Sequence, residues 1–388
     1  MEREIYMDYA ATTYIKPEVL EEMNPYLTQY FGNPSSIYHI SRKTKIAIDI
    51  ARERIANSIN ARHDEVFFTG GGSEADNWAI KGIAFANKDK GNHIITTNIE
   101  HHAVIHTCEY LEELGFEITY LPVDAFGFIN IEDLKNAIND KTILVSVMFA
   151  NNEIGTIEPI KEIGEICREK NVIFHTDAVQ AVGNITIDVK DMNIDLLSMA
   201  SHKFYGPKGI GSLYIRKGVK IHNLIHGGAQ ERARRAGTEN VAGIVGMGKA
   251  IEISIQNMEK EVNRLSSLRD KLIKTLLKIP GAKLNGALGK NRLPGNVNVS
   301  FENIDGEILL MNLDSMGICA SSGSACSAGA IEPSHVLLAL GISTELAKSS
   351  LRLSMGSGTT EEEVEYLMKV IPEVIEKLRK SNEQWNSR

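Results

Sequence analysis

The sequence has few cysteines and no pattern that would use them for structure. Only four occur in 388 residues, at Cys108, Cys167, Cys319 and Cys326. No two of them form a CxxC pair, so the sequence does not indicate a structural zinc site. So few cysteines in a chain of this length fit a reducing compartment, where a disulfide framework is not expected.

Long apolar runs and a strong charge of one sign are also missing. No apolar stretch reaches the roughly 18 residues that a membrane-spanning helix needs. The N-terminal segment MEREIYMDYAATT lacks the charged start and apolar middle of a signal peptide. The formal net charge of −8 gives nucleic-acid binding no electrostatic support. These absences favour a cytoplasmic protein that binds neither nucleic acid nor membrane.

What the sequence does contain, between residues 64 and 250, is an alternation of short apolar runs with amphipathic stretches. Such alternation predicts an α/β fold, in which helices cover both faces of a mostly parallel sheet. Ligands bind such sheets where the strands end and the loops gather. The expected strands are residues 65–69, 93–97, 117–123, 143–149, 172–178, 196–201 and 211–216.

The pattern changes in the C-terminal part. A long helix is expected from about 241 to 278, followed by strands at 295–303 and 349–356 and helices at 306–317 and 361–380. The length of the chain suggests two domains. We expect a large domain at 15–255 and a smaller α+β domain formed by 1–14 and 256–388.

Two apolar strands each end in a charged side chain. In SHKFYGPKGIG, Lys203 follows a strand and precedes a glycine-rich turn, where desolvation would lower its pKa and make its amine usable for a Schiff base. In HTDAVQAVG, Asp177 closes another strand, where its carboxylate would keep a pyridinium N–H protonated. The alternatives are a solvated loop lysine and a helix N-cap aspartate.

Two further motifs lie where a strand passes into a helix. In FFTGGGSEADN, glycines precede Ser73 and a helix, and helix N–H groups there would hold a phosphate, although plain capping is the alternative. In NIEHHAVIH, His101 and His102 open a helix about 100° apart, so we expect one ring in a site, stacked on an aromatic cofactor. A capped, half-exposed histidine is the alternative.

The last two candidates lie near the C-terminus. Cys326 occupies the small-residue stretch ASSGSACSAGA ahead of a helical segment, which suits a reactive thiol better than the surroundings of Cys319 do. Arg352, in the strand SSLRLSMG, suits bidentate binding of a substrate carboxylate, or equally a pair with a structural acid. Together the six signals describe a site for pyridoxal 5′-phosphate (PLP) with a carboxylate clamp and a thiol.

Seven motifs, in order along nearly the whole chain, resemble the NifS/IscS-type cysteine desulfurases. They are MDYAATT (7–13), FGNPSS (31–36), NNEIGT (151–156), HTDAVQ (175–180), SHKFYGPKG (201–209), RAGTEN (235–240) and SSGSACS (321–327). The resemblance implies an aminotransferase-like fold of type I, PLP as cofactor and a homodimer. It also implies sulfur removal from L-cysteine, giving alanine, and delivery of the sulfur to an iron–sulfur scaffold or another acceptor protein.

The resemblance further implies a role for each site residue. Lys203 would hold PLP and then remove the substrate's α-proton, and Cys326 would take the sulfur as a persulfide. His101 would stack on the ring and move protons. The remaining ring contacts would be Asp177, Gln180 and Asn152. The phosphate contacts would be Gly72, Ser73, Ser201 and His202, with Thr238 from a partner subunit.

Substrate binding would fall to Arg352, with Asn33 near it in the FGNPSS loop. No metal site is expected, apart from contact of Cys326 with a transferred iron–sulfur cluster. Two positions depart from many relatives: Ser73 replaces threonine, and Ala200 replaces a serine that would contact the phosphate. A selenocysteine lyase or cystine-type lyase on the same scaffold stays an alternative, as does a sulfur-transfer scaffold protein without catalysis.

Overall fold

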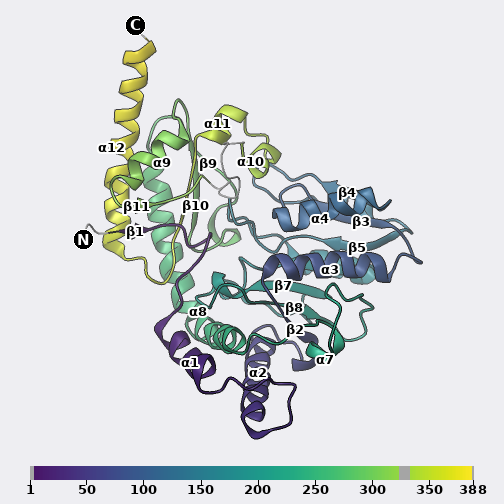
Figure 1. Cartoon of the computed structure of the whole chain (residues 1–388). Helices are drawn as coiled ribbons and strands as arrows, with labels where there is room; N and C mark the ends of the chain where they lie inside the picture. Colours follow the sequence, from purple (N-terminus) through teal and green to yellow (C-terminus); the bar gives the residue numbers. More distant parts are fainter. Residues whose placement is uncertain (1–3, 323–332, 387–388) are drawn as a thin grey trace.

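The computed structural model describes residues 4–322 and 333–386 of the chain. A seven-stranded sheet has the order β2-β8-β7-β6-β5-β3-β4 (Figure 1). The five strands from β7 to β4 are parallel, whereas β8 runs antiparallel to both β2 and β7. The strands are β2 (Val66–Thr69), β3 (His93–Thr97), β4 (Glu117–Leu121), β5 (Thr142–Ser146), β6 (Ile173–Asp177), β7 (Leu196–Ala200) and β8 (Gly211–Ile215).

Helices bury both faces of this sheet, which explains why its strands read as nearly continuous apolar runs. Successive side chains alternate between the faces. Leu196 and Leu213 pack with the first group of helices, and Leu197 and Tyr214 with the second. The first group is α3 (Gly72–Ala86) and α4 (His102–Glu113). The second group is α1 (Pro17–Thr28), α2 (His39–Ser58), α5 (Ile131–Ala137), α6 (Ile160–Glu169) and the start of α8 (Val241–Leu276).

Helix α8 connects the large sheet to a smaller layer, and Figure 1 shows it running from one to the other. Met247 packs on the large sheet, whereas Leu272 packs in the second core. The smaller layer is an antiparallel sheet of order β12-β10-β9. Its elements are β9 (Ala282–Leu284), β10 (Asn296–Phe301), α9 (Gly306–Asp314), α10 (His335–Ala339), α11 (Thr344–Lys348), β12 (Ser350–Ser354) and α12 (Glu361–Asn386).

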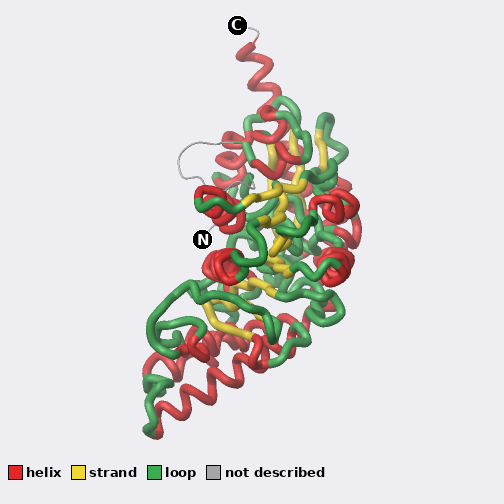
Figure 2. The backbone as a smooth tube through the Cα atoms, turned by 90° about the vertical axis from the view of Figure 1, so that its right-hand side faces the viewer, coloured by secondary structure: helices red, strands yellow, loops and turns green. Residues whose placement is uncertain are grey.

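The N-terminal strand β1 (Ile5–Tyr6) lies parallel to β11 (Ile318–Cys319), far away in the sequence. Residues 8–13 then lead toward the large sheet, where the Thr13 N–H donates to the carbonyl of His202 at 2.9 Å. The turned view in Figure 2 shows the two layers of strands with helices on either side. The domain boundaries stay a prediction. None of the helices in residues 4–322 and 333–386 is long and apolar enough to cross a membrane.

The loop between β8 and α8 contains a left-handed turn, α7 (Gln230–Ala233). Glu231 and Arg232 have φ values of 47° and 58°, which residues other than glycine rarely adopt. A buried ion pair holds this turn. Both terminal nitrogens of Arg52 lie 2.7 Å from the Glu231 carboxylate, which also accepts from the Phe68 N–H at 2.9 Å. The pair fixes the start of the segment that leads to Thr238.

Replacing Glu231 by alanine will lower the free energy of unfolding by about 3 kcal/mol, because Arg52 would remain buried without its counter-ion. The midpoint of urea-induced unfolding, followed by circular dichroism, measures this loss. Glu376 is a matched control, since it pairs with Lys380 on α12 but is 67% exposed. Glu376→Ala should cost less than about 1 kcal/mol. Equal, small losses in both variants would show that the ion pair does not hold the turn.

Candidate active site

The carboxyl ends of the parallel strands β3, β5, β6 and β7 surround a cavity of about 340 Å³. This is the edge of an α/β sheet at which ligands bind, and the volume suits a small molecule. Most of the residues that the sequence predicts for the site line this cavity. They are Gly72, Ser73, His101, Asn152, Asp177, Gln180, His202, Lys203 and Arg352.

Three of the predicted residues that the structure describes do not line it. Ser201 is buried between the lining residues Ala200 and His202. Thr238 and Asn33 are exposed in their loops, and the side chain of Asn33 accepts from the N–H of Ser35 at 2.9 Å. Cys326 lies outside the described residues.

Lys203 belongs to a single 3₁₀ turn, residues Ser201–Lys203, that directly follows β7. Its Nζ donates to the carbonyls of Ala10 and Ala11 at 2.6 and 2.8 Å. The side-chain amide of Gln180 donates to the same Ala10 carbonyl at 3.0 Å. The amine is therefore held in the wall of the cavity by the N-terminal segment. The motifs around Lys203 gave no sign of this contact.

Asp177 ends β6 and is 6% exposed. Its carboxylate accepts from the N–H of Val179 at 2.9 Å, and residues 179–184 form turns, so the expected alternative of a helix N-cap does not hold. Burial raises the pKa of Asp177, whereas His101, the Val179 N–H and Lys203 lower it. A buried carboxylate needs a cationic or N–H partner. The N–H of a protonated pyridine ring is such a partner.

Behind Asp177 lies a group of buried polar side chains that the motifs did not predict. The two ring nitrogens of His175 lie 2.8 Å from Ser146 Oγ and 3.0 Å from Ser198 Oγ. The Asp76 carboxyl of α3 lies 3.7 Å from the same ring. Burial lowers the pKa of His175 to about 3 and raises the pKa of Asp76 well above its ordinary value. His175 is therefore uncharged near neutral pH, and burial disfavours a negative charge on Asp76.

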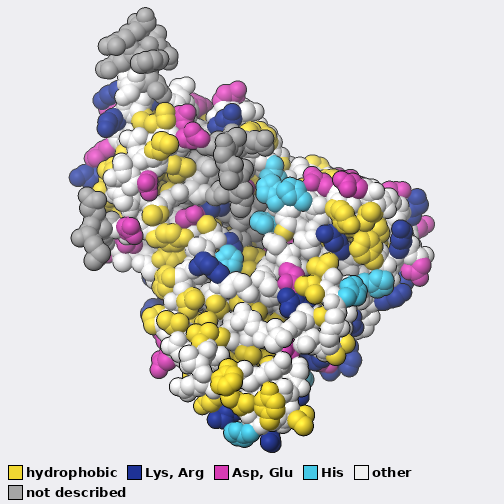
Figure 3. All heavy atoms as spheres, viewed as in Figure 1, with side chains coloured by type: hydrophobic (Ala, Val, Ile, Leu, Met, Phe, Trp, Pro, Cys, Tyr) yellow, Lys and Arg dark blue, Asp and Glu magenta, His cyan; other side chains and the backbone are white. Residues whose placement is uncertain are grey.

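His101 is the N-cap of α4, and its Nδ1 accepts from the N–H of Ala103 at 3.1 Å. Burial lowers the pKa of His101, which keeps the ring neutral. His102 also lines the cavity, so the expectation that only one of the pair would enter is wrong. Its ring packs at the edge, 4.9 Å from the ring of His106 and 4.8 Å from that of His335. Histidine side chains gather on the face of the molecule shown in Figure 3.

The first turn of α3 forms another wall of the cavity. The N–H groups of a helix's first turn have no acceptor within the helix, so they are available to an anion. The backbone at Gly72 lies close to Val179. A Cβ at position 72 would be only 2.9 Å from a methyl group of Val179, so a larger residue would not fit without a shift. The buried Ser201 Oγ has no hydrogen-bond partner among the described residues. Ser201 Oγ lies beside Gly206 and outside the cavity lining, so the N–H groups of the first turn of α3 are the donors that fit a phosphate group.

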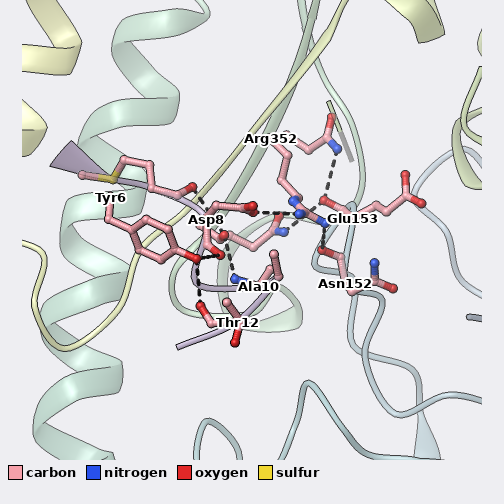
Figure 4. Close-up of polar contacts among 12 residues, drawn as sticks. Tyr6, Asp8, Ala10, Thr12, Asn152, Glu153 and Arg352 are labelled. Atoms are coloured by element: carbon pink, nitrogen blue, oxygen red, sulfur yellow. Dashed lines mark hydrogen bonds and ion pairs between the residues drawn. The ribbon is translucent and has the colours of Figure 1, made fainter. Parts of the chain in front are cut away.

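Arg352 reaches the cavity from β12 in the smaller layer. One terminal nitrogen donates to the Asp8 carboxylate at 2.8 Å and the other to the carbonyl of Asn152 at 3.2 Å (Figure 4). Its side chain is 3% exposed, and its Nε has no acceptor among the described residues. Arg352 thus pairs with an acid, as one alternative expected, and still keeps donors for a carboxylate.

Comparisons with known proteins decide the family. A sequence model of the aminotransferase class-V family matches residues 5–367. The chain belongs to this family. It is 63% identical over 387 residues to the cysteine desulfurase IscS of Clostridium botulinum, covering 99% of this chain and 98% of the relative.

Solved structures of the family are similar over most of the chain. A NifS-like protein superposes with a TM-score of 0.91 at 39% identity, covering 96% of this chain and 100% of the other. SspA in complex with cysteine superposes with a TM-score of 0.81 at 39% identity, covering 90% of this chain and 98% of the other. The expected aminotransferase-like fold is confirmed.

The family is PLP-dependent, as the sequence predicted, and the cavity fits this cofactor. Asp177 offers a buried acceptor for the ring nitrogen, and Lys203 offers an amine. The first turn of α3, at Gly72 and Ser73, offers N–H donors for the phosphate. When bound, PLP supplies an electron sink for charge that develops at the substrate's α-carbon. The role of each individual residue stays a prediction.

The stability of the protein will fall as the pH drops from about 6.5 toward 3, partly through His175. The unfolded chain protonates this imidazole near pH 6.5, whereas the folded protein does so only near pH 3, so acid favours unfolding. Each pH unit inside this window costs about 1.4 kcal/mol. His175→Gln should therefore show a weaker loss of melting temperature between pH 7.5 and 5.5. The exposed His63→Gln is the control, and identical slopes in both variants would refute this assignment.

Proposed function

We propose that this chain is a PLP-dependent cysteine desulfurase in which Lys203 holds the cofactor, Arg352 binds the carboxylate of L-cysteine and Cys326 takes the sulfur. One observation carries the proposal. Lys203, Asp177 and Arg352 converge on one cavity, in a chain that is 63% identical over 99% of its length to a cysteine desulfurase.

The surroundings of each side chain suit its proposed task. Arg352 is buried and keeps its Nε–H for the substrate's carboxylate. Asp177 carries the negative charge that keeps the pyridine nitrogen protonated. Lys203 exchanges its contacts with backbone carbonyls for the cofactor, and later accepts the proton from the substrate's α-carbon. His101 is neutral and its Nδ1 accepts from the Ala103 N–H, so its Nε2 carries a proton that it is able to donate and later regain.

Sulfur transfer needs a reactive thiolate, and three of the four cysteines do not suit the task. Cys108 and Cys167 are buried, and burial raises the pKa of both thiols. Burial also raises the pKa of Cys319. A thiol with a raised pKa is a poor nucleophile near neutral pH. This supports Cys326, which lies outside the described residues, as the acceptor.

In the proposed transfer, the Cys326 thiolate attacks the sulfur of the substrate. The new S–S bond forms as the Cβ–S bond of the substrate breaks, and the electron pair of that bond stays on the carbon side. Protonation at Cβ then gives alanine, and the sulfur remains on Cys326 as a persulfide. The sulfur is passed to an acceptor protein for iron–sulfur cluster assembly or for another sulfur-containing cofactor.

We also propose a cytoplasmic homodimer in which Thr238 reaches the phosphate of the partner's cofactor. Thr238 is exposed. Its segment is held at the start by Glu231 and further along by Arg235, which binds the Glu74 carboxylate at 2.8 and 3.0 Å. Glu74 belongs to the first turn of α3, so the same segment is tied to the wall that would hold the phosphate.

Adding L-cysteine to the purified holoenzyme will add the mass of one or more sulfur atoms to the peptide that contains Cys326. The adduct should disappear in Cys326→Ser, and sulfide release should fall by at least a hundredfold, because the nucleophile is lost. Cys319→Ser is the matched control and should keep the adduct. Mass spectrometry of the intact protein and its peptides gives the answer. Unchanged desulfuration in Cys326→Ser would favour a lyase that releases sulfur without a catalytic cysteine residue.

A further inference from the structure

The N-terminal segment 8–12 carries a carboxylate that the proposed function leaves without a task. In that proposal Asp8 contacts neither the cofactor nor the substrate. Its carboxylate nevertheless lies 2.8 Å from a terminal nitrogen of Arg352. The carbonyl of Asn152 holds the other terminal nitrogen at 3.2 Å. The guanidinium is thus held at both terminal nitrogens, and its buried Nε has no acceptor among the described residues.

A second acidic side chain lies near the same guanidinium. Figure 4 shows Asp8 and Glu153 on opposite sides of Arg352. Glu153 is buried, and its carboxyl accepts from Ser334 Oγ at 2.6 Å. Burial raises the pKa of Glu153, although Ser334 and Arg352 lower it. An arginine that is 3% exposed needs an acidic or carbonyl partner. Without Asp8, the guanidinium would lose its ion-pair partner and would be held only at the terminal nitrogen that contacts the Asn152 carbonyl, so its orientation would no longer be fixed from both ends.

Asp8 is itself firmly placed relative to β12, the strand that carries Arg352. The hydroxyl of Tyr6 donates to the carbonyls of Asp8 and Thr12, each at 3.0 Å. The N–H of Ala10 donates to Ser354 Oγ at 2.9 Å. A carboxylate fixed in this way can set the direction of a neighbouring arginine instead of following it.

We infer that Asp8 is a positioning residue, whose carboxylate fixes the Arg352 guanidinium in the orientation that binds the substrate's α-carboxylate. The inference rests on the proposed function, since it takes Arg352 as the carboxylate-binding residue. Only the side chain of Asp8 acts in this way. The neighbouring carbonyls of Ala10 and Ala11 contact Lys203, so an effect on the arginine is separable from one on the lysine.

The test compares L-alanine, the reaction product, with ethylamine, which lacks only its carboxylate. Both are titrated into the holoenzyme, and the absorbance change of the bound cofactor gives apparent dissociation constants. Asp8→Ala should raise the apparent dissociation constant of L-alanine about tenfold, the effect of losing one hydrogen bond to a charged group. It should leave the dissociation constant of ethylamine unchanged. Asp8→Asn keeps an acceptor for Arg352, so it should stay within about threefold of the unaltered protein.

Arg352→Gln separates the two levels of the argument. The single variant Arg352→Gln should weaken the binding of L-alanine. Adding Asp8→Ala to it should raise the dissociation constant by a further factor of less than about two, because both changes remove the same interaction. If Arg352→Gln binds L-alanine normally, the proposed substrate contact falls and the inference with it. If Arg352→Gln weakens the binding of L-alanine, but Asp8→Ala leaves this binding unchanged or tightens it, the inference about Asp8 is overturned and the proposed substrate contact of Arg352 stands.

Two further outcomes are decisive. Equal weakening of L-alanine and ethylamine in Asp8→Ala would show that Asp8 acts through Lys203, against the inference. A variant enters the comparison only if its melting temperature and the absorbance spectrum of its bound cofactor match those of the unaltered protein. If Asp8→Ala does not fold, Asp8→Ser replaces it, since its side chain is too short to reach Arg352, and the same tenfold loss is expected.

Discussion

The short N-terminal segment 8–12 holds together two cationic groups that come from different layers of the fold. Lys203 follows β7 of the large sheet, and Arg352 lies on β12 of the smaller one. The carbonyls of Ala10 and Ala11 hold the first, and the carboxylate of Asp8 holds the second. Without this segment, Lys203 would lose these two carbonyls and Arg352 would lose its ion-pair partner. The site therefore depends on the chain passing from β1 beside β11 to the large sheet.

The electrostatics of the cavity depend on which buried carboxyls stay neutral. Burial raises the pKa of Asp76 and of Glu100 well above their ordinary values. Glu100 accepts from Thr97 and from the N–H of Met148, which makes it part of the wall. Burial also raises the pKa of Asp177, but the Val179 N–H and Lys203 lower it. Of these three carboxyls, Asp177 is the one whose pKa Lys203 lowers, and it lies where a pyridine nitrogen would have to be kept protonated.

Much of this could be predicted from the sequence, because the relevant signals are local. The strand 93–97 has the bounds of β3, and the long helix expected at 241–278 is α8 (Val241–Leu276). Lys203 and Asp177 stood out because each ends an apolar strand. Other features leave no local signal. The antiparallel β8 between β2 and β7 follows from tertiary packing, and the left-handed turn at Glu231 contains no glycine. The carbonyls of Ala10 and Ala11 act through the backbone, which no motif reveals.

The central claim is that Lys203 is the amine that carries the cofactor, and a covalent label tests it most directly. Borohydride reduces the bond between PLP and its lysine and so fixes the cofactor to the chain. Peptide mass mapping of the reduced holoenzyme should find the phosphopyridoxyl group on the peptide that contains Ser201, His202 and Lys203. A label on another lysine, such as Lys208 in the glycine-rich turn, or no label at all, would contradict the account.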